Sequence, residues 1–408
     1  MRNKSSCLSL VSSRLFIQVV NTAYPVSIYI HIPFCTKKCG YCDFYSISGG
    51  SSYYSSVLER IILQLKTFIA KNPVIDVYTV YIGGGTPSSL PLNLLESFLS
   101  ALEDILPSNV EEFTMEVNPE DIHKPFLEML FSHHINRISM GVQSLNESVL
   151  KVLERNTSRY KTLKALDCLA SNWQENISFD LITSVPGQET ADTLRDLQTL
   201  LKFSPGHISL YTLTFENGTP LTKKLEEGTI HKVSEEHEAA MFDGCTDYLE
   251  ENGYYRYEIS NFSTPGEQSL HNKVYWDLNP YFGAGPSAVS TIPFQNKALR
   301  IENPRDMKSF LHGNFELINS QSFLLEHLLM GFRLIKGIHV GRIESIFPID
   351  IFSTFTRTID NWSRNLKFNE GYLSLDRSGL MLLNKFLSDI ADEIPEDLPE
   401  NYSWPLRS

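Results

Sequence analysis

The sequence predicts an α/β fold: a partial (β/α)6 TIM-like barrel followed by a small, mostly helical C-terminal domain. From Val26 to about Leu213, apolar β-rich runs alternate with stretches of 3.6-residue periodicity. Beyond Leu213 this rhythm stops. Right-handed crossovers would wind six such units into a curved parallel sheet, so the carboxyl ends of its strands should meet at one site.

The predicted strands are short runs rich in β-branched and aromatic residues, namely Val26–Ile32, Val77–Ile82, Glu112–Val117, Arg137–Met140, Ile177–Ile182 and Ile208–Leu213. The predicted helices carry apolar residues on one face, as Val57, Ile61, Leu65 and Phe68 do in the first of them. These helices are Ser52–Ala70, Leu92–Ile105, Pro125–His133, Tyr160–Ser171, Thr190–Leu201 and Ser234–Glu251. The last of them ends at Asn252-Gly253, a typical left-handed stop.

These patterns divide the chain into five parts. Residues 1–24 are expected to be an extension without ordered structure, in which Arg2, Lys4, Arg14 and the absence of acids faintly resemble a signal or transit segment. Residues 25–252 form the barrel, and 253–302 form an aromatic and glycine-rich β segment that closes it. Residues 303–390 form the C-terminal domain, with a hairpin near 368–375, and 391–408 are expected to be a solvated acidic tail.

Composition excludes several classes of protein. The 408 residues are 42% hydrophobic and 20% charged, as in a globular protein with an ample core. A net charge of -13 without a basic stripe argues against nucleic acid as a partner. No apolar run reaches the roughly 18 residues that predict a transmembrane helix. Cys7, Cys168 and Cys245 are scattered, which predicts unpaired thiols in a reducing compartment, the cytoplasm.

Three further cysteines, Cys35, Cys39 and Cys42, stand in a C-x3-C-x2-C pattern directly after the first predicted strand. Three thiolates can hold three irons of a [4Fe–4S] cluster and leave the fourth iron open, whereas clusters that only carry electrons mostly have four protein ligands. A zinc site with His31 as its fourth ligand is the alternative. The loop after a barrel strand is where such folds place their chemistry, and this position favours the cluster.

Polar or glycine motifs follow the next strands. Three glycines in Gly83–Thr86 would let a backbone approach a charged amino-acid group closely. Glu116 could accept hydrogen bonds from ribose hydroxyls, and Gln143 can both donate and accept. Arg155 suits a carboxylate, and Asp180 stands within an apolar run. Taken singly, each is equally compatible with a plain turn or a solvated charge.

Together, the segments YIHIPFC, GGGTP, EVNP, SMGVQS and DLI…PGQ resemble the oxygen-independent coproporphyrinogen III oxidase group of radical SAM proteins, over roughly residues 25–390. In that family the open iron binds S-adenosylmethionine (SAM), and the cofactors carry the hard chemistry. The resemblance implies that Cys35, Cys39 and Cys42 bind the cluster. It also implies SAM contacts for the matching positions, which are Tyr29, Gly84, Gly85, Thr86, Glu116, Gln143, Arg155 and Asp180, with Tyr41 beside the adenine.

Two features distinguish the branches of this group. The oxidase branch has a further cysteine where this chain has Phe44. The run from His271 to Trp276 matches the H-N-x-x-Y-W signature of the HemW-type haem-chaperone branch. That resemblance implies that haem binds with His271 as an iron ligand and with Tyr275 and Trp276 against the macrocycle. His31 and His207 would be the next candidate ligands, and a histidine–tryptophan pair in the core is the ordinary alternative.

The branch resemblance implies a haem chaperone that carries a [4Fe–4S] cluster, SAM and haem and passes the haem to acceptor proteins. The alternative is an oxygen-independent coproporphyrinogen III oxidase, which would remove two propionate carboxyls. An electron-transfer or zinc-binding structural protein is the third hypothesis. Phe44 and the H-N-x-x-Y-W signature favour the first over the second, and the strand-end motifs argue against the third. Whether the protein is an enzyme stays open at this point.

Overall fold

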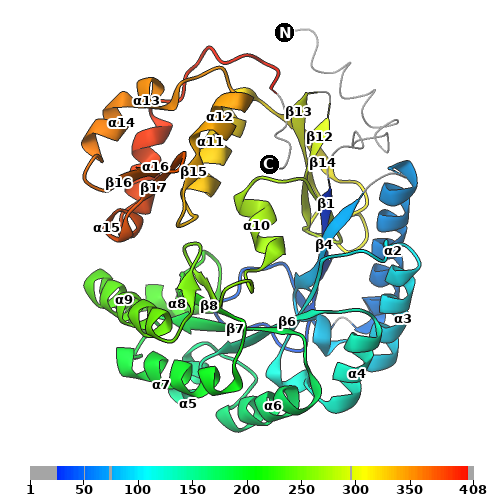
Figure 1. Ribbon diagram of the computed structural model, residues 1–408. Coiled ribbons are helices and arrows are strands. Elements are labelled where there is room, and N and C mark those ends of the chain that lie inside the picture. The colour runs from blue at the N-terminus through cyan, green and yellow to red at the C-terminus, as the bar shows by residue number, and fades with distance from the viewer. Residues whose placement is uncertain (1–24, 50, 73–75, 295, 403–408) are drawn as a thin grey trace.

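One curved sheet of twelve strands organises the fold, shown in Figure 1 as a computed structural model. The structure describes residues 25–402 except 50, 73–75 and 295. The predicted extension 1–24, with Cys7, lies outside the described residues. Six neighbouring parallel strands form the centre of the sheet: β1 (Val26–Ile32), β4 (Val77–Gly84), β5 (Glu112–Val117), β6 (Arg137–Gln143), β7 (Asn176–Thr183) and β8 (His207–Thr212). The predicted partial barrel is confirmed.

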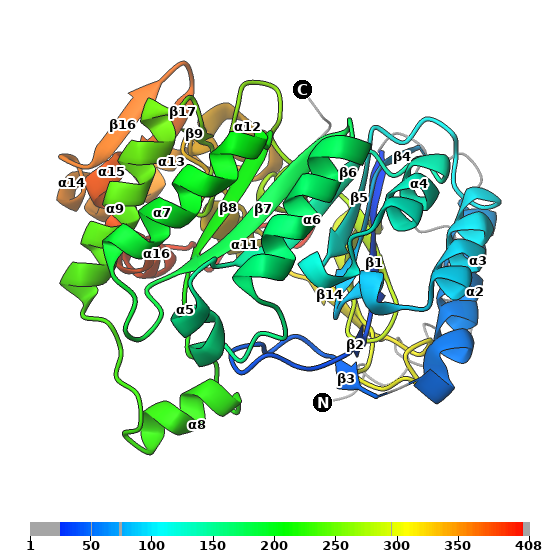
Figure 2. The ribbon, with the colours of Figure 1, turned by 90° about the horizontal axis from the view of Figure 1, so that it is seen from below.

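Helices cover the convex face of these strands (Figure 2). The six predicted ones are α2 (Tyr54–Lys71), α3 (Leu92–Glu103), α4 (Lys124–Ser132), α6 (Arg159–Asn172), α7 (Thr190–Leu200) and α9 (Glu235–Glu251). The predicted helix from Ser52 begins with a 3-10 turn, η1 (Ser51–Tyr53). Between Val26 and Ser234 the structure also has two short helices that were not predicted, α5 (Glu147–Val152) and α8 (Pro220–Glu226). Further 3-10 turns are η2 (Pro87–Ser89), η3 (Pro119–Asp121) and η4 (Leu201–Phe203).

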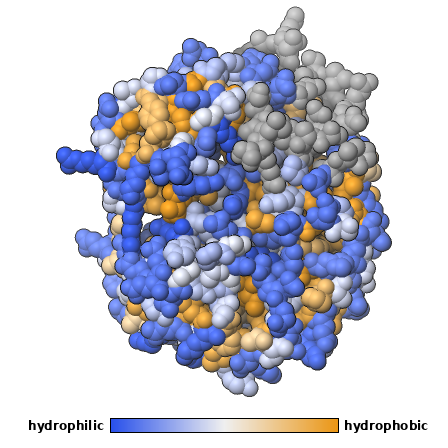
Figure 3. Space-filling model, in the orientation of Figure 1, coloured by the Kyte–Doolittle hydropathy of each residue, from blue (hydrophilic) through white to orange (hydrophobic). Residues whose placement is uncertain are grey.

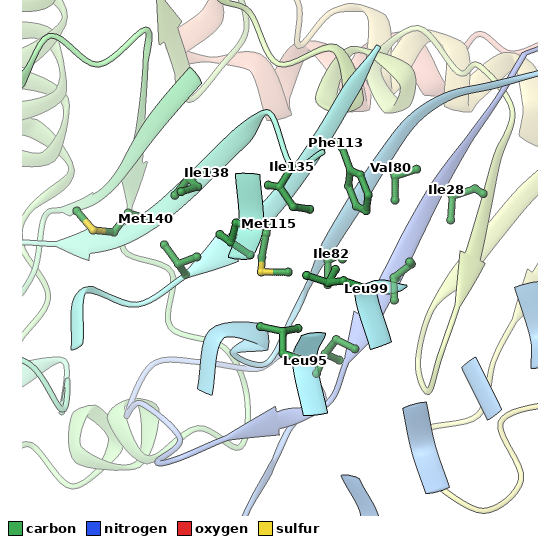
Figure 4. Packing of buried hydrophobic residues seen from close by; sticks show 14 of the residues in the cluster. Ile28, Val80, Ile82, Leu95, Leu99, Phe113, Met115, Ile135, Ile138 and Met140 are labelled. Atoms are coloured by element: carbon green, nitrogen blue, oxygen red, sulfur yellow. The ribbon is translucent and has the colours of Figure 1, made fainter. Parts of the chain in front are cut away.

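Side chains alternate along the strands between an apolar outer face and a polar inner face. The outer set packs beneath α3, and Figure 4 labels Ile28, Val80, Ile82, Phe113, Met115, Ile138 and Met140 of the strands with Leu95 and Leu99 of the helix. The intervening residues are polar and include Tyr29, Tyr81, Glu116, Ser139 and Asp180. A closed TIM barrel is filled by branched apolar residues. The polar interior here therefore indicates room for polar ligands.

Short strands extend both edges of the parallel sheet. β11 (Tyr281–Ala284) pairs parallel with β1, and β12 (Val289–Phe294), β13 (Lys297–Glu302) and β14 (Asn314–Ile318) follow in antiparallel order. At the other edge, β10 (Asn261–Ser263) pairs with β8, and β9 (Tyr255–Arg256) pairs with β10. The sheet thus extends to Ile318, beyond the domain boundary predicted at 302.

A seven-residue helix, α10 (Leu270–Trp276), lies within the curve of the sheet, where the sequence predicts only short strands (Figure 1). Ser269 caps it by accepting a hydrogen bond from the amide of Asn272. Glu112 of β5 accepts from the amides of Leu270 and His271, at 2.9 and 3.0 Å. A carboxylate at a helix N-terminus is stabilising. The start of this helix therefore depends on a residue that is 158 positions away in the sequence from Leu270.

The C-terminal domain has its own core, which includes Phe323, Phe332, Phe355 and Phe386. Its elements are α11 (Ser320–Gly331), β15 (Ile338–His339), α12 (Val340–Ile346), α13 (Ile351–Thr354), α14 (Thr356–Asn361), β16 (Leu366–Asn369), β17 (Tyr372–Leu375), α15 (Arg377–Met381) and α16 (Leu383–Ala391). The predicted hairpin is confirmed, since β16 and β17 pair antiparallel.

The described part of the predicted acidic tail is half-buried or exposed from 391 to 401, and it differs from the predicted solvated tail at Tyr402. Tyr402 is 4% exposed and stacks on Phe323 with 4.6 Å between ring centroids. Its hydroxyl donates to the carbonyl of Ile318 at 2.8 Å. This one buried aromatic ring anchors the end of the described segment on the C-terminal domain.

Hydrophilic residues cover most of the face seen in Figure 3, with hydrophobic ones scattered among them. Within the described part of the chain, no helix combines the length and the apolar character needed to cross a membrane.

Candidate functional site

The cysteine loop leaves the carboxyl end of β1 and is fixed at several points. Cys35 ends the short strand β2 (Phe34–Cys35), which pairs with β3 (Ile47–Ser48). Between the other two cysteines, the amide of Gly40 donates to the carbonyl of Leu153 at 3.1 Å. The carbonyl of Gly40 accepts from the amide of Leu221 at 2.8 Å. α5 and α8, which were not predicted, thus hold the loop that carries the predicted ligands.

Side chains that follow β4 and α5 reach two of the three thiols. The hydroxyl of Thr86 lies 3.6 Å from the Sγ of Cys35. The Nη1 of Arg155 lies 3.5 Å from the Sγ of Cys39. The structure therefore brings together residues that the sequence analysis selected from three separate motifs.

Asn118 connects these two contacts and was not among the predicted site residues. Its Nδ2 donates to the hydroxyl of Thr86 at 3.3 Å, and its Oδ1 accepts from the Nη2 of Arg155 at 3.0 Å. A side-chain amide can do both because it carries a donor and an acceptor. The signal in the sequence was its place two residues after Glu116, on the same strand-end motif.

Electrostatics around the loop favour a bound cation. Burial raises the pKa of the Cys42 thiol to about 11, and the neighbouring Cys39 also raises it. Burial alone would lower the pKa of Arg155, but Tyr41 and Cys39 outweigh it and raise the pKa, so the guanidinium stays charged. One guanidinium cannot neutralise three thiolates. The donor set therefore fits iron, which would replace the thiol protons.

The zinc alternative requires His31, and the structure places that ring elsewhere. Its Nε2 donates to the carbonyl of Tyr45 at 2.8 Å, and its Nδ1 lies 3.1 Å from the hydroxyl of Tyr29. In the described part of the chain, no three His, Cys, Asp or Glu side chains converge as they would around a single ion. In a four-iron cluster each cysteine bonds a different iron, so such convergence is not required. The geometry favours a cluster.

The glycine motif allows the end of β4 to lie directly against the cysteine loop. The amide of Gly85 donates to the carbonyl of Ile32 at 2.8 Å. A Cβ on Gly85 would lie 2.5 Å from the carbonyl oxygen of Phe34, and one on Gly83 would lie 2.7 Å from the carboxylate of Glu116. Gly84 has a φ of +109°, which disfavours a side chain. All three glycines are therefore required for this packing.

Two carboxylates lie on the polar inner face near the strand ends. Glu116 accepts from the Tyr81 hydroxyl at 2.9 Å and from the Gly84 amide at 3.1 Å, and burial raises its pKa to about 7. Asp180 accepts from the hydroxyl of Ser139 at 2.9 Å, and burial raises its pKa as well. Both can accept hydrogen bonds from a polar ligand at this mouth of the barrel.

The remaining predicted SAM contacts surround the same mouth. Tyr29 lies one strand from Tyr81, with 6.2 Å between ring centroids. Gln143 ends β6 with a φ of +64°, next to a register shift between β6 and β7. Such backbone strain is often found at ligand sites. Tyr41 packs against an apolar cluster that includes Val149 and Leu153.

His271, the predicted haem ligand, has both ring nitrogens engaged. Its Nδ1 lies 2.8 Å from the hydroxyl of Thr79, and its Nε2 lies 3.0 Å from that of Tyr275. The residue is 1% exposed, and burial lowers its pKa to about 3. An iron at Nε2 would have to displace Tyr275. The role of His271 as a ligand stays a prediction.

His207 is likewise engaged through both ring nitrogens. Ser178 lies 2.7 Å from its Nδ1, and Tyr257 lies 2.9 Å from its Nε2. It is the first residue of β8 and not the last, so it lies at the opposite end of the barrel from the cysteine loop.

Comparisons with known proteins agree with this geometry. A model of the radical SAM superfamily matches residues 29–200. A haem chaperone HemW from Lactococcus lactis is 33% identical over 79% of this chain and 85% of its own length. The mitochondrial radical S-adenosyl methionine domain-containing protein 1 of Danio rerio is 33% identical over 92% of this chain and 89% of its own length. The solved structure of coproporphyrinogen III oxidase (HemN) from Escherichia coli, described as a radical SAM enzyme, matches with a TM-score of 0.76. It covers 95% of this chain and 93% of that one at 17% identity, a likeness that shows the fold alone.

Proposed function

Because this chain belongs to the radical SAM family, in the branch of the HemW haem chaperones, we propose that it binds haem on a cluster-bearing barrel and transfers it to an acceptor protein. The observation that carries the proposal is the identity of 32–33% to relatives with that name over most of both chains. Phe44, which is 63% exposed where an oxidase would have a further cysteine, supports this branch.

We assign the cluster to Cys35, Cys39 and Cys42 and SAM to the strand-end residues around them. When bound, the cluster supplies an electron and an open iron for SAM. Thr86 and Arg155 would stabilise two of the thiolates, since hydrogen bonds to a charged group favour its charged form. Glu116 and Asp180 would accept hydrogen bonds from polar groups of SAM, and the Gly84 amide keeps Glu116 in place.

An experiment on one reconstituted, anaerobic sample separates the chaperone from an oxidase. We expect uptake of haem, followed by its transfer to an apo-haem protein, and no conversion of coproporphyrinogen III in the presence of SAM and reductant. If the sample takes up no haem but converts coproporphyrinogen III, the oxidase function replaces the chaperone. The acceptor would be identified by crosslinking the haem-loaded protein.

We place this function in a reducing compartment, because the five cysteines among the described residues are free. The cytoplasm is the first candidate. A mitochondrial location is the second, since residues 1–24 carry Arg2, Lys4 and Arg14 without any acid, and the similar protein of Danio rerio is named as mitochondrial. Imaging of the full chain beside a variant that lacks residues 1–24 decides between them.

A further inference from the structure

A cavity of about 870 Å³ lies between α10 and the C-terminal domain, apart from the cysteine loop. Residues of α10, α11, β15 and α12 line it. α10 and α11 lie side by side there (Figure 1). The volume is within the roughly 300–1,000 Å³ of small-molecule sites. Nothing in the assigned cluster and SAM site uses this cavity.

The lining suits a largely apolar ligand that carries negative groups. Its apolar part includes Val274, Leu334, Ile338, Ile343 and Ile346. The charged residues of the lining are three cations, Lys273, Lys336 and Arg342, and one acid, Asp277. This excess of positive charge stands out in a chain whose net charge is -13. Lys273 and Arg342 are half-buried and Lys336 is exposed, and such a cluster of cations attracts carboxylates.

α10 presents different residues to the barrel and to the cavity. His271 contacts Tyr81 of the barrel interior, and Tyr275 contacts Tyr281. Lys273, Val274 and Trp276 line the cavity instead. The indole nitrogen of Trp276 is buried without a hydrogen-bond partner among the described residues. The H-N-x-x-Y-W segment therefore contributes its tryptophan, and not its histidine, to the cavity.

His327 of α11 also lines this cavity, and only one of its ring nitrogens is engaged. Its Nδ1 donates to the carbonyl of Phe323, one turn earlier in the same helix, at 2.8 Å. Its Nε2 is buried with no hydrogen-bond partner among the described residues, and the residue is 5% exposed. Because Nδ1 faces its own helix, Nε2 is at the far edge of the ring. Histidines that bind a metal through one ring nitrogen almost always donate the other ring N–H, often to a backbone carbonyl, and the Nδ1 of His327 makes a contact of this kind.

We propose that this cavity is the haem site and that the Nε2 of His327 is the axial ligand of the iron. The inference rests on the proposed function and names the site at which it is carried out. Lys273, Lys336 and Arg342 would receive the propionates, and Trp276 would pack against the macrocycle. Burial lowers the pKa of His327 to about 3, so its imidazole is neutral, as iron ligation requires.

The test titrates haem into the cluster-loaded protein and compares three histidine variants. His327→Ala should shift the Soret band and weaken haem binding by at least about tenfold, and added imidazole should restore the band. His271→Ala tests the ligand expected from the signature, and His339→Ala removes an exposed histidine of the same cavity lining. Both should keep the wild-type spectrum. A folded His327→Ala protein with the wild-type band and affinity would overturn the assignment.

A second arm avoids the buried histidine in case its loss prevents folding. Lys273→Glu with Lys336→Glu should weaken haem binding by about tenfold, because the propionates lose their cations. The same double variant should bind haem dimethyl ester, whose carboxyls are masked, as the wild-type protein does. Equal binding of haem by both proteins would place haem elsewhere. Wild-type protein that binds no haem at all would refute the proposed function, whereas haem binding that both arms leave unchanged refutes only this site.

Discussion

Arg155 lies directly against Cys39, with its Nη1 3.5 Å from the thiol sulfur. Its Nη2 meanwhile donates to the carbonyl of Gly141 at 2.8 Å and to the side chain of Asn118 at 3.0 Å. A planar guanidinium makes such divided contacts, whereas an ammonium acts as a point charge. Arg155 thus joins the end of β6 to the cysteine loop and places a cation beside a predicted iron ligand.

Replacing Arg155 with lysine keeps the positive charge but loses the planar guanidinium, whose two nitrogens contact different partners. Arg155→Lys should lower the affinity for SAM by about 1–3 kcal/mol, because polar partners that the guanidinium joins are left unpaired. Calorimetry on cluster-loaded protein measures this loss. Arg159→Lys, at an exposed position on α6, is the matched control and should bind SAM as the wild type does. If Arg155→Lys binds SAM as the wild type does, the planar guanidinium is not needed for SAM binding.

Each of the three loop cysteines should be required for the cluster. Cys35→Ala, Cys39→Ala and Cys42→Ala should each lose the absorption near roughly 400 nm and the content of about four irons per chain. Iron and sulfide analysis after anaerobic reconstitution is the measurement. Cys168→Ala and Cys245→Ala are controls, because both thiols lie on helices away from the loop. Full iron and sulfide in any of the three loop variants would contradict the ligand assignment.

Asn118 is a positioning residue, because it reaches the thiols only through Thr86 and Arg155. Asn118→Ala should leave the iron content near the wild-type value but shift the reduction potential of the cluster, since hydrogen bonds to the sulfurs help to set it. Redox titration followed by electron paramagnetic resonance measures the shift. Asn118→Gln, which keeps the amide but moves it, should give an intermediate potential. If the wild type, Asn118→Ala and Asn118→Gln have the same cluster reduction potential, Asn118 has no positioning role at the site.

The sequence predicted most of the barrel because its signals are local. β1 and β5 begin and end where predicted, since each is an apolar run with a proline near its end. α10 was missed because part of its cap is Glu112, which lies 158 residues from Leu270 in the sequence. Short strands were predicted within 253–302, but the order in which β11–β14 pair was beyond local signals, since the choice of a pairing partner depends on the whole sheet.

In the candidate site too, some residues could be recognised from the local sequence, whereas others depend on partners from elsewhere in the chain. The thiols and the glycine motif were recognisable from residue type and spacing alone. Asn118 was overlooked because its function depends on two partners from other segments, Thr86 after β4 and Arg155 after α5. His327 gave no signal, because a single histidine on the apolar face of a helix is indistinguishable from a core residue until its hydrogen bonds are known.

Asp180 should contribute to SAM binding through its carboxylate. Asp180→Ala should weaken SAM binding by about 1–3 kcal/mol, because it leaves polar groups of the ligand unpaired. The serine hydroxyls of Ser139 and Ser178, which donate to Asp180, would also lose their acceptor. Calorimetry on the cluster-loaded protein is the measurement, with Asp167→Ala on the exposed face of α6 as the control. A wild-type protein that binds no SAM would contradict the whole pocket.

Glu116 should make the stability of the protein depend on pH. Burial raises its pKa to about 7 from an ordinary value of 4.5, so between these values the folded state binds more protons than the unfolded state. Stability from this group is therefore present at low pH and is lost as the pH rises through about 7. Glu116→Gln cannot ionise and escapes this loss. Relative to the variant, the free energy of unfolding of the wild type should fall by roughly 1–3 kcal/mol between about pH 5 and pH 8.

Denaturant unfolding at a series of pH values, under anaerobic conditions, tests this difference. Glu111→Gln changes an exposed acid immediately before the same strand and should follow the wild-type curve. If the free energy of unfolding depends on pH in the same way for the wild type and Glu116→Gln, then Glu116 is not buried as a carboxylic acid in the folded protein. Bound SAM should reduce the difference, because hydrogen bonds from the ligand would favour the charged carboxylate and lower its pKa.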